Sequence, residues 1–183
     1  MNSIQLIKVI AVVGAATLGA TQLANAQNTT NPSSSDKKFV REALAGENAQ
    51  VDLGKLAVQK GSSDDVKEFG RKMVDDHTKL NEEMRVVADK EGIRAPAGMT
   101  AKEKAQMTKL ASLSGESFDK AYIAAMVKDQ RGDLAALKRE ATAGNDTAIK
   151  EEASQGMKLI EQHLQLAEEM ARIHKVQVEH SGQ

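Results

Sequence analysis

The sequence predicts an all-α protein: a ferritin-like four-helix bundle with a short extra helix in the crossover between helices two and three. The chain is rich in alanine, glutamate, lysine, leucine, glutamine and methionine, and it contains only two prolines. Four long segments carry apolar residues at steps of three and four, which is the spacing of one helical face. The connections within the first and second pairs of segments are short, so each pair should form an antiparallel hairpin.

The first 26 residues have the pattern of a signal peptide. Lys8 precedes an apolar run over residues 9–20, and Ala24-Asn25-Ala26 is a small-x-small cleavage site. The run is shorter than the roughly 20 residues of a membrane span, although an uncleaved anchor is the alternative. We therefore expect cleavage after Ala26 and a periplasmic or secreted mature chain with no transmembrane segment. Residues 27–35 should be a disordered tether.

Composition excludes several classes of function. The chain has 25 basic and 26 acidic residues and few aromatic ones, so neither a basic face nor a stacking platform for nucleic acid is present. It has no cysteine, which excludes disulfides, thiolate chemistry, iron–sulfur clusters and cysteine-based zinc sites. The stability of the fold must then come from its hydrophobic core.

The bundle domain should span residues 36–174. Ser35 or Asp36 can cap a first helix that runs to about Lys60 and stops at Gly61. Two serines and two aspartates open the second helix, which ends at Gly92.

The connection after Gly92 is long. A capping box, Thr100-x-x-Glu103, opens a short helix inside it, and nine or so extended residues complete a return along the bundle. The third long helix should run over residues 116–143. The fourth follows a very short turn and should end near His174. Residues 175–183 should fray, leaving His174 and His180 facing solvent.

Each of the four apolar stripes carries one polar residue near the middle of its helix. These are Gln50, His77, Gln130 and His163. In a bundle of similar-length helices the midpoints share one layer, so the four side chains should converge inside the core. Asp76 and Asp129 each precede one of them by a single position. We expect these two aspartates to act as interhelical partners behind the cluster.

Several blocks of the sequence resemble a bacterial exported family. They are residues 50–57, 69–77, 114–122 and 163–167. The family is catalogued as domain of unknown function 4142, a ferritin-like bundle often labelled an outer-membrane or periplasmic protein, and the resemblance covers about residues 36–174. In the family pattern the position of Gln50 is usually Glu and that of Gln130 is usually His. The resemblance thus implies a Glu-His-His-His metal set, which this chain alters at two of the four positions.

Enzymatic chemistry is not expected. A di-iron carboxylate site needs Glu-x-x-His pairs, but Val74 and Ile160 occupy the positions three residues before the histidines. The sequence also lacks a Gly-x-Ser-x-Gly elbow and a phosphate-binding loop.

Two interpretations of the polar layer remain open. In the first, the four side chains hydrogen-bond one another and fix the register of the helices. In the second, His77 and His163, with the amide oxygens of Gln50 and Gln130, hold a single divalent metal ion. The thioethers of Met73 and Met126 lie one turn before two of these positions and would suit Cu(I).

The leading hypothesis is therefore an exported, non-enzymatic helical-bundle protein, an envelope stress-related or binding module. Its partner would be an envelope protein or a small ligand, and no cofactor is expected. One alternative is a periplasmic metal-binding protein that uses the mid-bundle site. Another is a structural protein associated with the outer membrane or cell wall.

Overall fold

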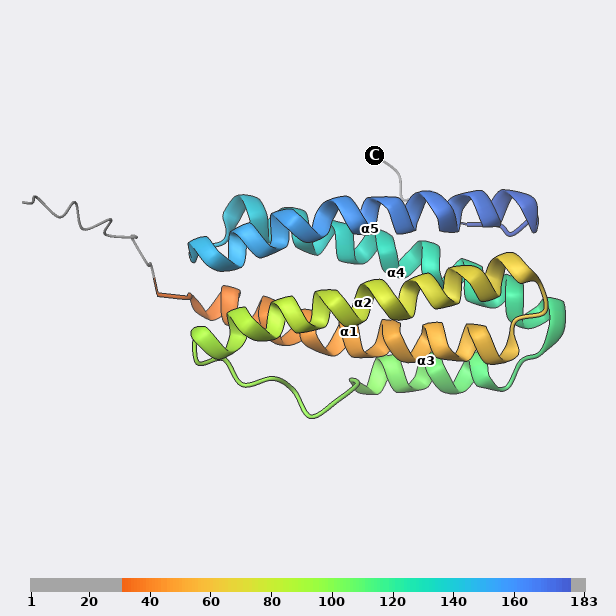
Figure 1. Ribbon diagram of the computed structural model, residues 1–183, viewed down its shortest axis with the longest axis horizontal. Coiled ribbons are helices and arrows are strands. Elements are labelled where there is room, and N and C mark those ends of the chain that lie inside the picture. Colours follow the sequence, from red (N-terminus) through yellow and green to blue (C-terminus); the bar gives the residue numbers. More distant parts are fainter. Residues whose placement is uncertain (1–30, 179–183) are drawn as a thin grey trace, which may run out of the picture.

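A computed structural model describes residues 31–178, which form five α-helices and contain no strand (Figure 1). The helices are α1 (Ser34–Lys60), α2 (Asp64–Lys90), α3 (Ala101–Ala111), α4 (Gly115–Ala143) and α5 (Thr147–Ile173). The all-α class is as predicted, and the short helix α3 lies in the connection between the second and third long helices. The predicted signal peptide, the first part of the predicted tether and His180 lie outside the described residues.

The four long helices lie side by side (Figure 1). α1 packs mainly against α2, and α4 mainly against α5, so the two hairpins are the tightest units. The hairpins meet where α2 contacts α5 and where α1 contacts α4. After α2 the chain returns along the bundle through α3, which packs against α1 and α4. As a result α2 and α4 run in the same direction (Figure 1).

The start of α1 differs from the prediction. Its N-cap is Ser33, not Ser35 or Asp36, and the helix includes the last two residues of the predicted tether. The physical reason is a capping box. The Ser33 hydroxyl accepts a hydrogen bond from the Asp36 backbone N–H at 3.2 Å, and the Asp36 carboxylate accepts one from the Ser33 N–H at 2.8 Å. Asp36 therefore acts at the third helical position instead of at the cap.

Two buried aspartates each tie one hairpin to the turn of the other. Asp36 on α1 also accepts hydrogen bonds from the backbone N–H groups of Asn145 and Asp146, in the turn between α4 and α5. Asp119 on α4 accepts hydrogen bonds from the backbone N–H groups of Ser62 and Ser63, in the turn between α1 and α2. These contacts satisfy donors that a helix start leaves unpaired, and they hold both ends of the bundle together.

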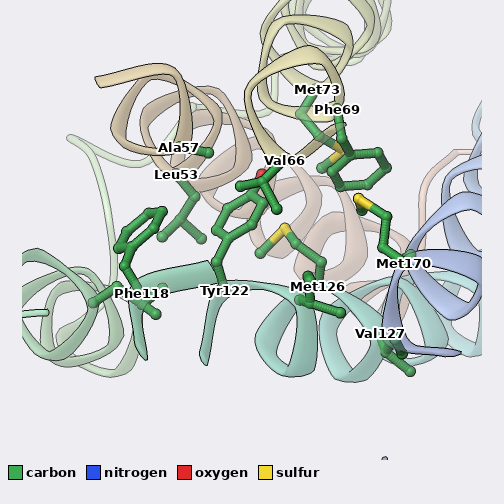
Figure 2. Packing of buried hydrophobic residues seen from close by; sticks show 14 residues of the cluster. Leu53, Ala57, Val66, Phe69, Met73, Phe118, Tyr122, Met126, Val127 and Met170 are labelled. Carbon is green, nitrogen blue, oxygen red and sulfur yellow. The ribbon is translucent and has the colours of Figure 1, made fainter. Parts of the chain in front are cut away.

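The hydrophobic core is divided into two clusters. The larger cluster includes Leu53, Phe69, Met73, Tyr122, Met126 and Met170, and Figure 2 shows how these side chains pack between the long helices and α3. The smaller cluster, near the start of α1, consists of Val40, Leu44, Met84, Ala88, Ile93 and Ile149. Along the sequence of each hairpin, the two polar residues of the predicted layer lie between residues of the larger cluster and residues of the smaller one.

α1 and α2 approach most closely at a pair of glycines. A Cβ atom built on Gly54 would lie 2.7 Å from the backbone oxygen of Gly70, and one on Gly70 would lie 2.8 Å from the oxygen of Gly54. Ordinary contacts of this kind are 3.4–4 Å. The absence of a side chain at both positions therefore sets the distance between the two helices.

The C-terminal segment is better packed than the sequence predicts. The side chain of His174 is 16% exposed, and its Nε2 lies 2.8 Å from Oδ2 of Asp65 on α2, so it does not face solvent as expected. Val176 and Val178 pack against the larger hydrophobic cluster. This part of the predicted frayed tail contacts the core because its two valines remove apolar surface from water.

Candidate functional site

The four polar side chains predicted to share one layer are all buried. Gln50 is 5% exposed, His77 1%, and Gln130 and His163 are fully buried. We call these four residues the polar centre. The rings of His77 on α2 and His163 on α5 lie against each other, with their centroids 5.1 Å apart. The structure thus brings the two histidines together.

One of the two interpretations has the four residues hydrogen-bonded to one another; in the described part of the chain, no direct hydrogen bond joins any two of them. The two histidines have carboxylate partners instead. His77 Nδ1 lies 2.5 Å from Glu47 Oε2, and His163 Nε2 lies 2.8 Å from Asp76 Oδ2. A charged acceptor makes a stronger hydrogen bond than an amide or a second imidazole, which explains the preference.

The amide of Gln50 has a weaker partner. Its Nε2 lies 3.5 Å from Oδ2 of Asp133 on α4, at the limit of a hydrogen bond. Asp129, the second aspartate expected behind the cluster, accepts a hydrogen bond from Gln106 on α3 at 2.5 Å. Asp129 therefore fastens the crossover helix to α4, because the rotation of one residue turns its side chain away from Gln130.

The proton positions at His163 follow from its surroundings. Burial lowers the pKa of His163 to about 4, although the neighbouring Asp76 carboxylate favours the charged form. The imidazole is then neutral at pH 7 and its single N–H is Nε2–H, which donates to Asp76. Burial works to raise the pKa of Asp76, but hydrogen bonds from Lys72 and His163 bring it below its ordinary value. Asp76 is therefore ionised and orients the ring.

Several polar atoms of the centre have no hydrogen-bond partner in the described part of the chain. They are Gln50 Oε1, His77 Nε2, His163 Nδ1 and both polar atoms of the Gln130 side chain. A buried polar atom without a partner costs about 1–3 kcal/mol. An enclosed cluster of such acceptors and donors is chemically suited to an ion or a very small polar ligand. Each histidine presents one free nitrogen, while a carboxylate holds the other.

This arrangement bears on metal binding in two ways. Histidines that bind metals usually donate their second N–H to a carboxylate, which fixes the tautomer and the ring orientation. His77 with Glu47 and His163 with Asp76 have this form. Within residues 31–178, however, no group of three or more His, Cys, Asp or Glu side chains is placed to hold a metal ion. The strong donors are thus limited to two imidazole nitrogens.

Sequence reasoning missed Glu47 and Asp133. Both line a cavity of about 220 Å³ between α1 and α4. Burial, and then the negative charge of Glu47, raise the pKa of Asp133 to about 7. A signal for them was present: Glu47 lies three residues before Gln50, and Asp133 three residues after Gln130, so each shares a helical face with a member of the polar centre.

Comparisons with known proteins agree with this fold. A family model described as Domain of unknown function (DUF4142) matches residues 21–170. No curated protein matches the sequence. Along the described residues, no helix is both long enough and apolar enough to span a membrane.

Two solved structures resemble the chain. One is a DUF305 protein from Streptomyces coelicolor, described as a candidate secreted protein, with a TM-score of 0.68 and 15% identity over 80% of this chain and 97% of that one. The other is a DUF305 fragment from Deinococcus radiodurans, with a TM-score of 0.69 and 12% identity over 78% of this chain and 99% of that one. At these identities the likeness concerns the fold alone.

Proposed function

This chain belongs to the DUF4142 family, and we propose that it is an exported, non-enzymatic binding protein of the cell envelope whose ligand site is the polar centre. The scaffold is a ferritin-like bundle in this proposal, a topology supported by the parallel course of α2 and α4. Export is supported by the signal-peptide pattern of residues 1–26 and by the likeness to a candidate secreted protein.

One observation carries the proposal: His77 and His163 lie ring against ring in the buried core, and each has one nitrogen held by a carboxylate and one nitrogen without a partner among the described residues. A core designed only for stability has little use for such a pair, because apolar residues of the same volume would avoid the desolvation cost. The centre is too enclosed for a large substrate. Its ligand should therefore be of the size of an ion.

The candidate ligand with specific support is a single metal ion. His77 Nε2 and His163 Nδ1 would supply the strong donors, and Gln50 Oε1 could add an amide oxygen. The Gln50 and Gln130 amides replace the charged or imidazole ligands that the family pattern implies at these positions. Zinc sites usually have three or four strong ligands, so we expect weak and exchangeable binding here, as in a carrier or a stress buffer and unlike a structural site.

Elemental analysis of the protein purified from the periplasmic fraction, without chelator or affinity tag, tests this proposal. It should be paired with melting curves recorded with and without zinc, copper, iron and manganese. We expect bound metal, or a melting temperature that rises with one of these ions. Both effects should be lost in His77→Ala and His163→Ala.

His174→Ala is the matched control, since His174 is also held by a carboxylate but lies outside the polar centre. It should keep the metal effect. A protein that contains no metal and melts at one temperature with every ion would reject the metal ligand. A metal effect that is lost in His174→Ala would place the ion elsewhere.

A further inference from the structure

A groove runs along the seam where α1 meets α4. The 220 Å³ cavity described above forms its inner part, and an adjoining cavity of about 320 Å³ extends it toward the start of α1. The two cavities share Phe39, Glu42 and Ala136. A Cβ atom built on Gly46, in the wall of the inner cavity, would meet nothing within 4 Å, so the glycine leaves this space open.

The inner cavity combines two kinds of wall. Apolar side chains from three helices, among them Phe39, Leu137 and Ile160, form one part. The charged residues that line it are all acidic, and they include Glu47 from α1 and Asp133 from α4. Among the described residues no lysine or arginine is ion-paired with Glu47 or Asp133; Glu47 is paired with His77, and Asp133 receives only the long hydrogen bond from Gln50.

The pair of carboxylates is electrostatically unbalanced. Glu47 and Asp133 come from different helices and line one cavity, so their negative charges repel each other, and among the described residues no lysine or arginine is paired with either. The buried amide of Gln50 lies beside Asp133, to which its Nε2 donates, and its Oε1 has no hydrogen-bond partner among the described residues. A cation placed between the two carboxylates would relieve the repulsion, and a cation with N–H groups would also donate a hydrogen bond to the free amide oxygen.

We propose that this cavity is a binding site for a small organic cation, a primary alkylammonium whose charged end lies between Glu47 and Asp133 and whose alkyl chain lies against Leu137 and Ile160. The ammonium group has three donors, which matches two carboxylates and one amide oxygen. A magnesium or calcium ion fits less well, because it requires six or more oxygen ligands and gains nothing from apolar walls. The site goes beyond the proposed function: it adjoins the polar centre through Gln50 and Glu47, but it lies in a separate cavity between α1 and α4 and needs no metal.

Calorimetric titration of the whole protein with hexylammonium chloride tests the proposal. The buffer is at pH 8, where a primary ammonium is charged, and it contains EDTA so that no metal at the polar centre contributes. Hexanol and hexanoate are the matched probes for the alkyl chain alone and for the opposite charge. We expect saturable binding of hexylammonium and at least about tenfold weaker binding of both other compounds, because they lack the charge-assisted hydrogen bonds.

Three variants complete the test. Asp133→Asn should weaken hexylammonium binding by about tenfold or more, because one carboxylate is lost. Asp52→Asn is the control: it removes an acid that lies on the same helix as Glu47 but outside the cavity, and it should leave hexylammonium binding unchanged. Gly46→Leu should abolish binding by filling the cavity that Gly46 lines, since a Cβ at that position meets nothing within 4 Å. Equal binding of hexanol, binding unchanged in Asp133→Asn, or no binding of hexylammonium would each overturn the proposal.

Discussion

Replacing Gly54 or Gly70 by alanine should destabilise the protein, although alanine is the better helix former. The new Cβ of Gly54→Ala would lie 2.7 Å from the Gly70 oxygen and 3.2 Å from Met73 Cβ, and that of Gly70→Ala 2.9 Å from Ala57 Cβ. To restore ordinary contacts, α1 and α2 must separate by several tenths of an ångström. Overpacking of this kind costs about 1–3 kcal/mol, and the separation also loosens the neighbouring core, which offsets the roughly 1 kcal/mol gained in helix propensity.

The net expectation is a loss of about 1–2 kcal/mol in the free energy of unfolding for each variant, and it can be measured by urea denaturation at pH 7. Gly132→Ala is the matched control. Gly132 is a helical glycine on α4 whose Cβ would meet nothing within 4 Å, so this variant should gain up to about 1 kcal/mol. The reasoning would be refuted if Gly54→Ala and Gly132→Ala were stabilised equally. The separation should also lengthen the contact between α1 and α2 that orients His77, so ligand binding should weaken together with stability.

Three further predictions concern buried ionisable groups. The pKa of His163 is about 4 in the folded state, against an ordinary value of about 6.5, so the unfolded chain binds more protons between these two values. The free energy of unfolding should therefore fall by up to about 3 kcal/mol as the pH drops from 6.5 to 4, and this pH dependence should be reduced in His163→Gln. Burial, and then the Asp36 carboxylate, raise the pKa of Glu140 to about 7, so ionisation of this group should lower the stability of the fold as pH rises from about 4.5 to 7. Glu140→Gln should therefore melt at a higher temperature than the unchanged protein at pH 8. Asp119→Ala should cost about 1–2 kcal/mol in urea unfolding, because two backbone N–H groups at the start of α2 lose their acceptor, whereas Asp52→Ala should change stability by less than about 0.5 kcal/mol.

The helices could be predicted because their signals are local. Gly61 ends α1, Thr100 opens α3 with a capping box, and α4 ends at residue 143, all as predicted. Ser33 was missed because three consecutive serines can each serve as an N-cap. Ser33 is the cap because it lies three residues before Asp36, whose carboxylate also binds the turn between α4 and α5. This second contact joins residues far apart in the sequence, so the sequence pattern does not reveal it.

The polar centre could be predicted only in part. Apolar stripes with one polar residue near each midpoint identified His77 and His163, since this depends on periodicity and helix length alone. Their partners depend on side-chain conformations and on which neighbouring helix faces each carboxylate. Glu47 and Asp133 were therefore not identified, and the groove between α1 and α4, whose volume depends on the spacing between helices, could not be inferred from sequence.

The central claim is that His77 and His163 each present one free nitrogen to a common ligand while a carboxylate holds the other nitrogen. It can be tested by measuring the ¹⁵N chemical shifts of the histidine rings at pH 8 before and after one equivalent of zinc is added. We predict a proton on His77 Nδ1 and on His163 Nε2, and a metal-induced shift confined to His77 Nε2 and His163 Nδ1. The opposite tautomers, or zinc shifts at His174 with none at the other two rings, would contradict the account.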